Sequence, residues 1–486
     1  MKPRFEILVK EEREQIYAGA LQVLRETGIL IKNENARKIL TENGVEFKPD
    51  SHIALLEEEL VKECLRKTPN SIKMYDRQGD LAMTLEGENV YYCPGSTAMS
   101  FLDSNGIIRE PLTDDFIKFI QLTEELPHIH AQSTAMVPAD IDELLADRYR
   151  LYLVLKYAQK PVITGAFTTF GVRDMKDMLV AVREAYGDDL TKKPLAIFDV
   201  CPSPPLMWSE QTTQHLIDCA RFSIPIEFIS MPLSGATSPA SLAGSLVQHT
   251  AETLSGIVLS QLIKAGTPII WGGSPDIFDQ LDGTTAMGAI DTTLLTCAFV
   301  EIGKQFGFPT RAPRGYSDAK TIDAQTGLEA GLGIVFAALA GINVVAGLGI
   351  LNFGGSCQSL EKLVIDNEIC GMAERFVKGI EVTEESLAVS LFKEVGPHGN
   401  FLTTAHTLKW FKRDQFLPTE IIDRKDLQKW TQDGALTIVD HAQKQVTELL
   451  TRHVHEPLPE DGDTKLKQIM RNAAKRAEVT YLPHDL

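Results

Sequence analysis

The chain has 486 residues, of which 44% are hydrophobic, and a formal net charge of −18. This length predicts one large domain with appendages, or two to three ordinary domains, and the composition is that of a globular protein with ample core. The acidic balance argues against a nucleic acid or an anionic membrane surface as partner, because both attract basic proteins. It is compatible with a cationic substrate.

Seven cysteines are scattered along the chain without a close pair. This pattern fits reduced thiols and predicts neither a disulfide framework nor a structural zinc site. The first residues, MKPRFEILVKEER, contain no apolar signal core, and no run reaches the roughly eighteen apolar residues that a membrane span needs. The sequence therefore predicts a cytoplasmic protein that contacts no membrane and holds no metal.

Residues 1–90 predict a helical and β-hairpin cap. Apolar positions recur at helical spacing in three segments, EQIYAGALQVLRETG, ENARKILTENG and ALLEEELVKECLRK, which end at Gly28, at Gly44 and before Pro69. The alternating runs IKMYDRQGDLAMTL and NVYYC then predict a short hairpin or meander.

Residues 91–379 carry eight short strand-like runs, most of them followed by a stretch of helical period. The runs are YYCPGS at 91, HAQSTA at 130, PVITGA at 161, LAIFDV at 195, PIEFIS at 225, PIIWGG at 268, PTRAPR at 309 and INVVAG at 342. Their starts lie 30 to 43 residues apart, and eight is the strand count of a (β/α)8 TIM barrel. A doubly wound open sheet is the alternative, but it would more naturally use five to seven strands, and no GxGxxG follows the first strand. We therefore predict a TIM-barrel catalytic domain.

Residues 380–486 predict a mainly helical appendage that packs on the barrel. Helical segments run from EESLAVSLFKEVG through IVDHAQKQVTELLTRHVHE to TKLKQIMRNAAKRAE, and PLPEDGD is typical of a surface loop.

The stretch from 311 to 368 contains two consecutive strand-loop-helix units. In such units the loops after the strands carry the chemistry. Gly327, Gly331 and Gly333 interrupt the helix of the first unit, each at a cost of about 1 kcal/mol relative to alanine. They indicate either a tight contact between helix and strand or a bulky flat ligand lying on that surface.

The loops at the expected catalytic face contain many small, hydroxyl and aromatic residues. They show no close His/Glu/Asp cluster, HExxH, P-loop or GxSxG elbow, although a Ser/His/Asp triad stays open because any large chain contains those residues. Aromatic faces can cage a quaternary ammonium, at about 0.5 to 2 kcal/mol per good contact, or they can fill the core and the barrel mouth. The candidate rings are Tyr92, Phe167, Phe170, Trp208, Trp271, Phe278, Tyr316 and Phe353.

The acidic residues near this stretch have two interpretations. Glu361 and Glu368 are seven positions apart and share a helical face, which a solvated surface explains better than catalysis does, while Asp366 points elsewhere. Asp318 directly follows a strand end, so its carboxylate can cap the next helix or reach a ligand.

Three motifs resemble the trimethylamine methyltransferase family: GYSDAKTIDAQTGLE at 315–329, LEKLVIDNE at 360–368 and GPHGNFLTTAHT at 396–407. ALQVLRETG at 20–28 and FLDSNGIIREPLTDDF at 101–116 resemble it too, so the resemblance spans nearly the whole chain. It implies a TIM barrel that moves a methyl group from a methylamine to cob(I)alamin, with the barrel mouth receiving the cobalamin of a cognate corrinoid protein. A nucleophile supplied by that partner would explain the missing catalytic cluster, because only positioning and charge placement remain for this chain.

Two departures from the family narrow the implied substrate. Enzymes for trimethylamine carry pyrrolysine, whereas this chain has only the twenty standard residues, so the resemblance points to the branch without pyrrolysine. That branch uses quaternary amines such as glycine betaine, proline betaine or carnitine. The family motif reads nearer to GPGGHFL, where this chain has GPHGNF at 396–401; His398 or His406 could replace that histidine or hydrogen-bond locally.

The resemblance and the loop chemistry together nominate site residues. Asp318 and Glu361 would be catalytic by balancing the charge of the ammonium, and an arginine would hold a substrate carboxylate through a bidentate pair. The expected substrate-binding residues are Tyr92, Trp271, Phe353, Arg311, Arg314 and Tyr316. The expected cobalamin surface comprises Gly315, Ser317, Asp323, Gln325, Asn352, Gly354 and Gly355.

Two other functions fit the same sequence. A TIM-barrel aldolase or lyase would use the amine of Lys320 as a Schiff base. A betaine-sensing or corrinoid-docking subunit would bind its ligand without turnover. A homo-oligomer with an interface at the helical ends is compatible with either, but no sequence feature fixes it.

Overall fold

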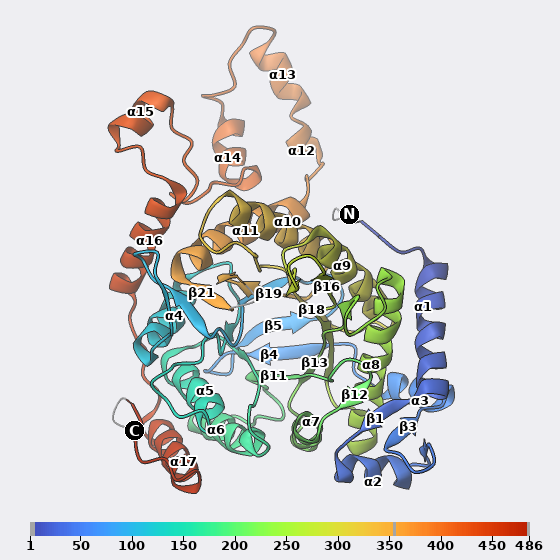
Figure 1. The fold of residues 1–486 in the computed structure, drawn as a ribbon. Helices are drawn as coiled ribbons and strands as arrows, with labels where there is room; N and C mark the ends of the chain where they lie inside the picture. Colours follow the sequence, from blue (N-terminus) through green and yellow to red (C-terminus); the bar gives the residue numbers. More distant parts are fainter. Residues whose placement is uncertain (1–4, 353–355, 484–486) are drawn as a thin grey trace.

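A computed structural model describes residues 5–352 and 356–483, and eight parallel strands form the centre of the fold (Figure 1). The strands are β6 (Tyr91–Pro94), β9 (Gln132–Ser133), β10 (Val162–Thr164), β11 (Ala196–Val200), β13 (Ile226–Ser230), β15 (Ile269–Gly273), β18 (Thr310–Pro313) and β19 (Val344–Leu348). They are hydrogen-bonded in the order β6-β19-β18-β15-β13-β11-β10-β9, and a parallel bridge between Ala98 and Met136 links the loops that follow β6 and β9. Seven strands lie within the predicted runs and β19 extends one residue beyond its run, so the TIM-barrel prediction is confirmed and the open sheet is excluded.

One helix follows each strand and packs outside the barrel. The helices are α4 (Thr113–Glu125), α5 (Ala146–Tyr157), α6 (Gly171–Ala185), α7 (Glu210–Phe222), α8 (Leu242–Ile263), α9 (Ile290–Gln305), α10 (Ala324–Leu339) and α11 (Leu360–Lys378). Several begin at a side-chain cap: the Ser209 side chain accepts from the backbone of Thr212 at the start of α7, and that of Ser241 accepts from Gly244 at the start of α8.

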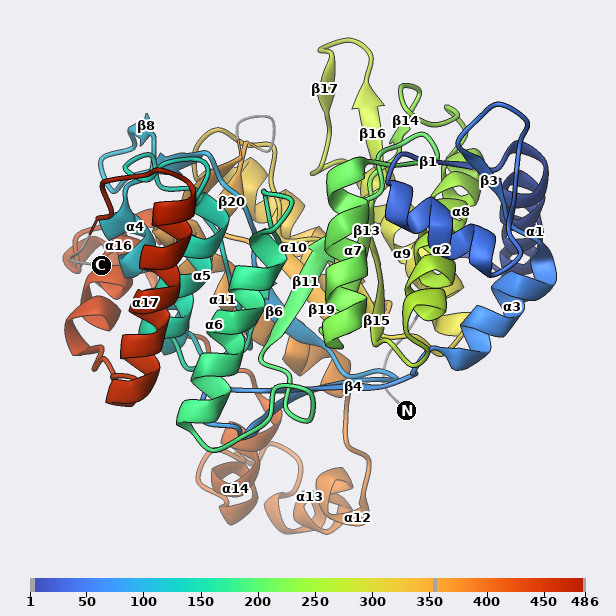
Figure 2. The same ribbon diagram turned by 90° about the horizontal axis from the view of Figure 1, so that it is seen from below.

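A hairpin closes the amino-terminal end of the barrel. It consists of β4 (Ile72–Tyr75) and β5 (Leu81–Leu85) and crosses the lower end of the barrel in Figure 2. Its Ile72, Met74 and Met83 side chains form one buried cluster with Ile163 and Ile270 of the barrel strands. This cluster fills the lower end of the barrel with apolar side chains.

The amino-terminal segment covers α8. It contains α1 (Lys10–Gln22), which continues as a π-helix over Val23–Thr27, and then α2 (Glu34–Glu42) and α3 (Glu58–Lys67). These are the three helices that the sequence predicts. The short strands β1 (Ile29–Ile31), β2 (Glu46–Phe47) and β3 (Ile53–Leu55) were not predicted; they form a small sheet with β12 (Met207–Trp208).

Two small sheets stand at the carboxyl end of the barrel (Figure 2). One joins β7 (Ser100–Leu102) and β8 (Ile108–Arg109) to β20 (Ile350–Leu351) and β21 (Cys357–Ser359). The other contains β14 (Leu233–Ser234), β16 (Asp276–Asp279) and β17 (Thr284–Thr285). They border the barrel mouth.

The carboxyl-terminal segment is helical, as predicted. Residues 380–436, called the arm below, project from the barrel and contain α12 (Glu384–Leu387), α13 (Val389–Val395), α14 (Ala405–Asp414) and α15 (Leu427–Gln432) (Figure 1). The chain then returns as α16 (Ile438–Arg452) against α4 and α11, and as α17 (Glu460–Arg476) against α5 and α6. The domain boundaries at 90 and 379 stay predictions. None of the helices in the described part of the chain has the length and apolar character to span a membrane.

Candidate functional site

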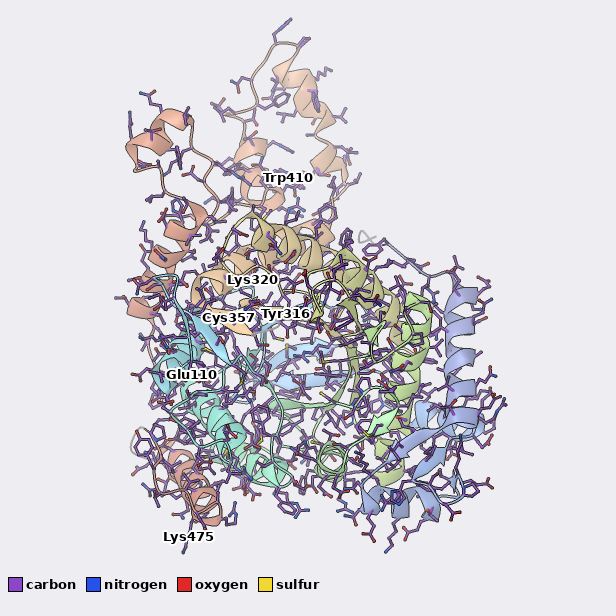
Figure 3. The ribbon with its side chains drawn as sticks, in the orientation of Figure 1. Glu110, Tyr316, Lys320, Cys357, Trp410 and Lys475 are labelled. Carbon is purple, nitrogen blue, oxygen red and sulfur yellow. The ribbon has the colours of Figure 1, made fainter. Side chains whose placement is uncertain are left out.

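A cavity of about 430 Å³ lies at the carboxyl ends of the barrel strands. Its walls come from the ends of β6, β10, β11, β13, β15 and β18 and from the loops that follow them. The lining residues include Ser96, Thr97, Phe167, Asp199, Cys201, Glu227, Met231, Ser274, Met287, Arg311, Tyr316 and Ser356. Figure 3 labels Tyr316, which lies within the ring of barrel helices. Position and size fit a small-molecule site.

Three charged side chains meet in this cavity. Arg311 Nη1 lies 2.5 Å from Glu227 Oε2 and 3.3 Å from Asp199 Oδ1. The two acids are neighbours because Asp199 on β11 pairs with Glu227 on β13 in the barrel register. Gly272 on β15 leaves room for this contact, since a Cβ there would lie 2.7 Å from Glu227 Cγ.

The protonation of the two acids is shaped by burial and by each other. Burial raises the pKa of Glu227 to about 8, with Arg311 opposing this rise and Asp199 adding to it. Burial also raises the pKa of Asp199. Burial alone would lower the pKa of Arg311, but the two carboxyl groups outweigh it, so the guanidinium stays charged. Near pH 7 the acid pair therefore shares one proton, and its remaining negative charge balances Arg311.

Aromatic rings contribute to the cavity wall. The ring of Phe167 covers the buried guanidinium of Arg150, whose Cζ lies 4.7 Å from the ring centroid. Tyr316 lies against Gly347, which has a φ of 95°; a Cβ there would lie 2.7 Å from Tyr316 Cδ1. Burial raises the pKa of Tyr316, so its hydroxyl stays neutral. Both rings can face a cation held by the acid pair.

Arg314 and Asp318 form a separate cluster beside the cavity. Arg314 is buried and donates through Nη1 to Thr293 Oγ1 at 3.1 Å. Burial raises the pKa of the adjacent Asp276 to about 7, with Arg314 opposing the rise. Asp318 Oδ2 accepts a hydrogen bond of 2.8 Å from the backbone of Gly288. Neither Arg314 nor Asp318 lines the cavity, so both act here as supports of the neighbouring loops.

The other residues of the SDAK motif organise the start of α10. Ser317 Oγ and the Asp318 backbone N–H each donate to Glu329 Oε2 at 2.7 Å, and Gln325 Nε2 donates to Glu329 Oε1 at 2.9 Å. Asp323 is the residue that caps α10, because its Oδ1 accepts from the backbone of Gln325. Ser317 is buried, whereas Asp323 and Gln325 are exposed.

The glycines of α10 divide between the two interpretations. A Cβ on Gly333 would lie 2.3 Å from the carbonyl oxygen of Arg314, so this glycine permits a tight contact between helix and strand. A Cβ on Gly327 or Gly331 would meet no atom of the described residues within 4 Å, so both glycines face open space. Gly315 is enclosed: a Cβ there would lie 2.6 Å from Leu348 Cδ2.

Two rings expected in the cage lie outside the cavity. Tyr92 is fully buried, and its ring lies beside that of His130. Trp271 is fully buried on the outward face of β15 and donates through Nε1 to the carbonyl oxygen of Phe299 on α9. Side chains alternate along a strand, so Trp271 packs under α9 while the next position, Gly272, faces Glu227. We do not assign Tyr92 or Trp271 to the cage.

Two further expected residues, Glu361 and Asn352, also lie apart from the cavity lining. Glu361 is buried at the start of α11, where it accepts from Ser359 Oγ at 3.1 Å. Asn352 has a φ of 44° and donates through its backbone to the carbonyl oxygen of Ala319. Phe353, Gly354 and Gly355 lie outside the described residues.

His398, His406 and Lys320 do not line the cavity either. His398 and His406 belong to the arm, and His406 stacks on Trp410, which Figure 3 places outside the barrel. The amine of Lys320 is exposed and donates to the carbonyl oxygen of Asp318 at 2.7 Å.

Asp199 and Glu227 are charged cavity residues that the sequence did not nominate. Both lie inside mainly apolar strands, AIFDV and IEFIS. An acid within a strand buried on both faces is itself a signal, because an unpaired buried charge is costly and must find a partner. Arg311, in the run TRAP, carries the same signal and is the partner.

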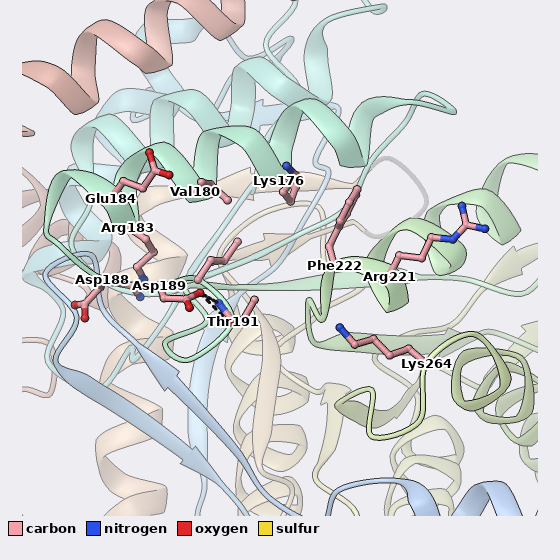
Figure 4. Close-up of a pocket in the computed structure, with 11 residues that line it drawn as sticks. Lys176, Val180, Arg183, Glu184, Asp188, Asp189, Thr191, Arg221, Phe222 and Lys264 are labelled. Carbon is pink, nitrogen blue, oxygen red and sulfur yellow. Dashed lines mark hydrogen bonds between the residues drawn. The ribbon is translucent and has the colours of Figure 1, made fainter.

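A second hollow, also of about 430 Å³, lies between α6, α7 and the loop before β11 (Figure 4). Its basic side chains serve local structure: Lys176 pairs with Asp177, Lys264 donates to Ser223, and Arg183 donates to the carbonyl oxygen of Lys193. It lies away from the carboxyl ends of the strands, where barrel enzymes bind substrate.

A barrel sealed at one end, with a charged and aromatic cavity at the other, is the architecture of a TIM-barrel enzyme. The chain belongs to the trimethylamine methyltransferase family, whose model matches residues 1–479, and it is a methyltransferase. This confirms the resemblance seen in the sequence.

Similar proteins match along nearly their whole length. A trimethylamine methyltransferase, MttB, from Desulfitobacterium hafniense strain DSM 10664 / DCB-2 is 29% identical over 474 residues, covering 97% of this chain and 94% of the relative. A glycine betaine methyltransferase from D. hafniense strain Y51 is 28% identical over 475 residues, covering 97% of this chain and 98% of the relative. The crystal structure of the Methanosarcina barkeri monomethylamine methyltransferase, MtmB, aligns with a TM-score of 0.51 at 13% identity over 92% of this chain and 89% of that chain, and this likeness concerns the fold alone.

Proposed function

We propose that this enzyme takes a methyl group from a small quaternary amine of the glycine betaine, proline betaine or carnitine type. The acceptor is cob(I)alamin carried by a cognate corrinoid protein that docks at the barrel mouth, and the setting is the cytoplasm. The observation that carries the proposal is the cavity itself, which offers an acid pair and two ring faces to a cation. A relative named as a glycine betaine methyltransferase supports the substrate class.

The cavity suits an ammonium that cannot donate hydrogen bonds. Phe167 and Tyr316 offer ring faces to the N-methyl groups, at about 0.5 to 2 kcal/mol for each good contact. Met231 and Met287 add polarizable surface. Asp199 and Glu227 supply the balancing negative charge.

Arg311 is our choice for the carboxylate of a betaine. It lines the cavity, whereas Arg314 lies behind the wall in its own cluster. An ammonium beside the acid pair weakens the hold of these acids on Arg311, and this leaves the guanidinium able to pair with the substrate carboxylate.

The chemistry requires little from the protein besides placement and charge balance. The C–N bond breaks with its electron pair staying on nitrogen, so the leaving group is a neutral tertiary amine. The corrinoid, when bound, supplies the nucleophile in its cob(I) state. The bound ammonium favours the ionised form of Glu227, and once the methyl group has left and the amine is neutral, Glu227 takes up a proton from solvent again.

The barrel mouth fits a large apolar ligand brought by a partner. The cavity has the volume of a small-molecule site, so a corrin ring would lie over it. Exposed apolar side chains border the mouth: Ile108 on one hairpin is 44% exposed, and Leu281 on the other is 96% exposed. Asp323, Gln325 and Asn352 stay candidates for this surface, whereas Gly315 and Ser317 are buried behind it.

The test is the visible spectrum of reduced cob(I)alamin mixed with the enzyme and, separately, glycine betaine, proline betaine, carnitine or trimethylamine. We expect conversion to the methylcobalamin spectrum with a quaternary amine. Silence with all four, with the cognate corrinoid protein also supplied, would contradict the proposal. Binding of an amine without conversion would identify a binding subunit instead. Borohydride trapping of Lys320 would identify the lyase.

A further inference from the structure

The arm has almost no core of its own. No residue of α12, α13 or α15 is buried, and within residues 380–436 only Trp410 and Ile421 are. Twelve large hydrophobic side chains of the arm are 36% to 85% exposed. Helices of this length are marginal in water without tertiary packing, so the arm requires a surface that covers it.

The arm is nevertheless an ordered unit. Glu385 pairs with Lys409, and Arg413 Nη2 lies 2.6 Å from Glu381 Oε2, so α14 is tied to the α12 segment. At its base, Thr419 Oγ1 donates to Glu368 Oε2 on α11 at 2.7 Å. The apolar side chains are thus presented on a held framework that projects from the barrel (Figure 1).

The barrel helices beside the arm present an uncovered apolar face. On each of α9, α10 and α11 a pair of large hydrophobic residues four positions apart is at least 40% exposed: Ile290 and Leu294, Leu328 and Leu332, Met372 and Phe376. Gly327 and Gly331 directly precede Leu328 and Leu332 on α10 and have open space above them, so a helix can approach closely there. Other barrel helices are covered, since α1 and α3 pack on α8, and α17 on α5 and α6; α16 packs on α4 and also contacts α11, away from the exposed pair Met372 and Phe376.

We propose that two copies of this chain associate on this side, with the arm of each packing on the α9–α11 face of the other. One surface thus pairs with itself about a two-fold axis, which is the commonest arrangement of soluble homo-oligomers. At about 100 Å² per buried aliphatic side chain, the exposed portions amount to about 1,000 Å² per copy, and a standard interface needs about 800 Å² from each partner.

A second copy is the occupant that the surface favours. The arm carries seven basic and nine acidic residues and is nearly neutral, so it can pack on a second copy without the repulsion that the chain's net charge of −18 would otherwise cause. A docking corrinoid protein must reach the mouth, whereas the arm extends beside the opposite end of the barrel (Figure 2). A transient partner would also leave the apolar side chains of the arm exposed to solvent whenever it is not bound, whereas a second copy covers them permanently.

The oligomeric state of the full-length chain tests this proposal. Sedimentation equilibrium or light scattering at micromolar concentration should give a dimer. Leu408→Glu in the arm and Gly331→Arg on α10 should each raise the dimer dissociation constant by at least about 30-fold. Gly331→Arg is the safer variant for folding, because the position is open and glycine is the weaker helix former. The matched control is Leu81→Glu, a 54% exposed leucine on the barrel hairpin, which should stay dimeric.

Three outcomes would overturn the proposal. A monomeric wild-type chain is the first, and a dimer that persists in both variants is the second. The third is a monomeric wild type whose complex with its corrinoid partner is lost in Leu408→Glu, which would show that the arm binds that partner instead of a second copy. The readout does not depend on activity, so failure here leaves the proposed reaction untouched.

Discussion

Asp199 and Glu227 link binding to protonation. Their pair keeps one proton near neutral pH because both are buried beside a single guanidinium. A cation that enters the cavity favours the doubly ionised pair, so it competes with that proton. Amine affinity should therefore depend on pH through a group that lies inside a barrel strand.

The first prediction is a pH dependence of cation binding. From pH 6 to 8 the affinity for tetramethylammonium should rise, by up to about tenfold per pH unit, and then level off as Glu227 ionises at about 8. Isothermal titration calorimetry across this range checks it, and Glu227→Gln should flatten the curve. A slope that survives in Glu227→Gln would assign the proton to another group.

The raised pKa of Glu227 also makes the free energy of unfolding depend on pH. The folded protein keeps a proton on Glu227 up to about pH 8, whereas the unfolded chain loses it near the ordinary value of 4.5. The contribution of Glu227 to the free energy of unfolding is therefore complete below pH 4.5 and is lost as the pH rises to 8.

The second prediction concerns the ring face of Phe167. Phe167→Leu should raise KM for glycine betaine by about 3 to 30-fold, the range set by one cation–π contact, with kcat nearly unchanged. The loop should hold its shape, because the backbone N–H groups of Phe167 and Thr168 donate to Asp147. Phe167→Tyr keeps a ring and is the control. Equal KM values in the leucine and tyrosine variants would remove Phe167 from the cage.

At the scale of elements, the strands were predictable and the direction of individual side chains was not. Eight apolar runs at a regular pitch carry the barrel signal, because a strand buried on both faces must be apolar throughout. That same continuity hides which face a side chain takes, so Trp271 was expected in the cavity but packs under α9. Arg311 and Tyr316 line the cavity, and both stand at or just after a strand end, where the sequence does indicate a direction. The small sheet of β1, β2 and β3 was missed because strands of two or three residues show no period.

The third prediction concerns a buried pair on α11 that ties two loops together. Lys362 Nζ lies 2.5 Å from Asp366 Oδ2 and donates to the carbonyl oxygen of Gly315 at 2.7 Å, while Asp366 accepts from the backbone of Gly349. Lys362→Met leaves the buried carboxylate of Asp366 without its ion-pair partner and should lower the free energy of unfolding by about 3 to 5 kcal/mol. Urea titration measures this.

Two further variants complete that experiment. Combining Lys362→Met with Asp366→Leu should restore part of the lost free energy of unfolding, because the unpaired Asp366 carboxylate is no longer present. Lys10→Met removes an exposed pair with Glu14 and should change little. A small effect of Lys362→Met alone would mean that the two loops hold their positions without the pair.

For the whole molecule, the two ends of the barrel differ in use. The hairpins β7–β8 and β16–β17 rise beside the mouth with exposed apolar tips, and the β4–β5 hairpin closes the other end (Figure 2). The proposed docking surface therefore lies on the hairpins, apart from the cavity that binds the amine.

The fourth prediction separates docking from chemistry. Leu281→Glu should lower the rate of methyl transfer to the corrinoid on its partner protein by about tenfold or more, because Leu281 is 96% exposed at a hairpin tip. Transfer to free cob(I)alamin should stay unchanged, and Leu81→Glu should affect neither reaction. An equal loss in both assays would show that the β16–β17 hairpin shapes the cavity instead.

The apolar cluster that closes the lower end of the barrel also determines how substrate and product reach and leave the cavity. A cavity with a single opening cannot admit the amine once a large protein covers that opening. The demethylated product cannot leave until that protein dissociates. Turnover should thus follow an ordered sequence in which the amine binds first and the demethylated amine leaves last. An excess of the methyl-accepting protein should slow the enzyme, because that protein would cover the cavity before the amine has bound.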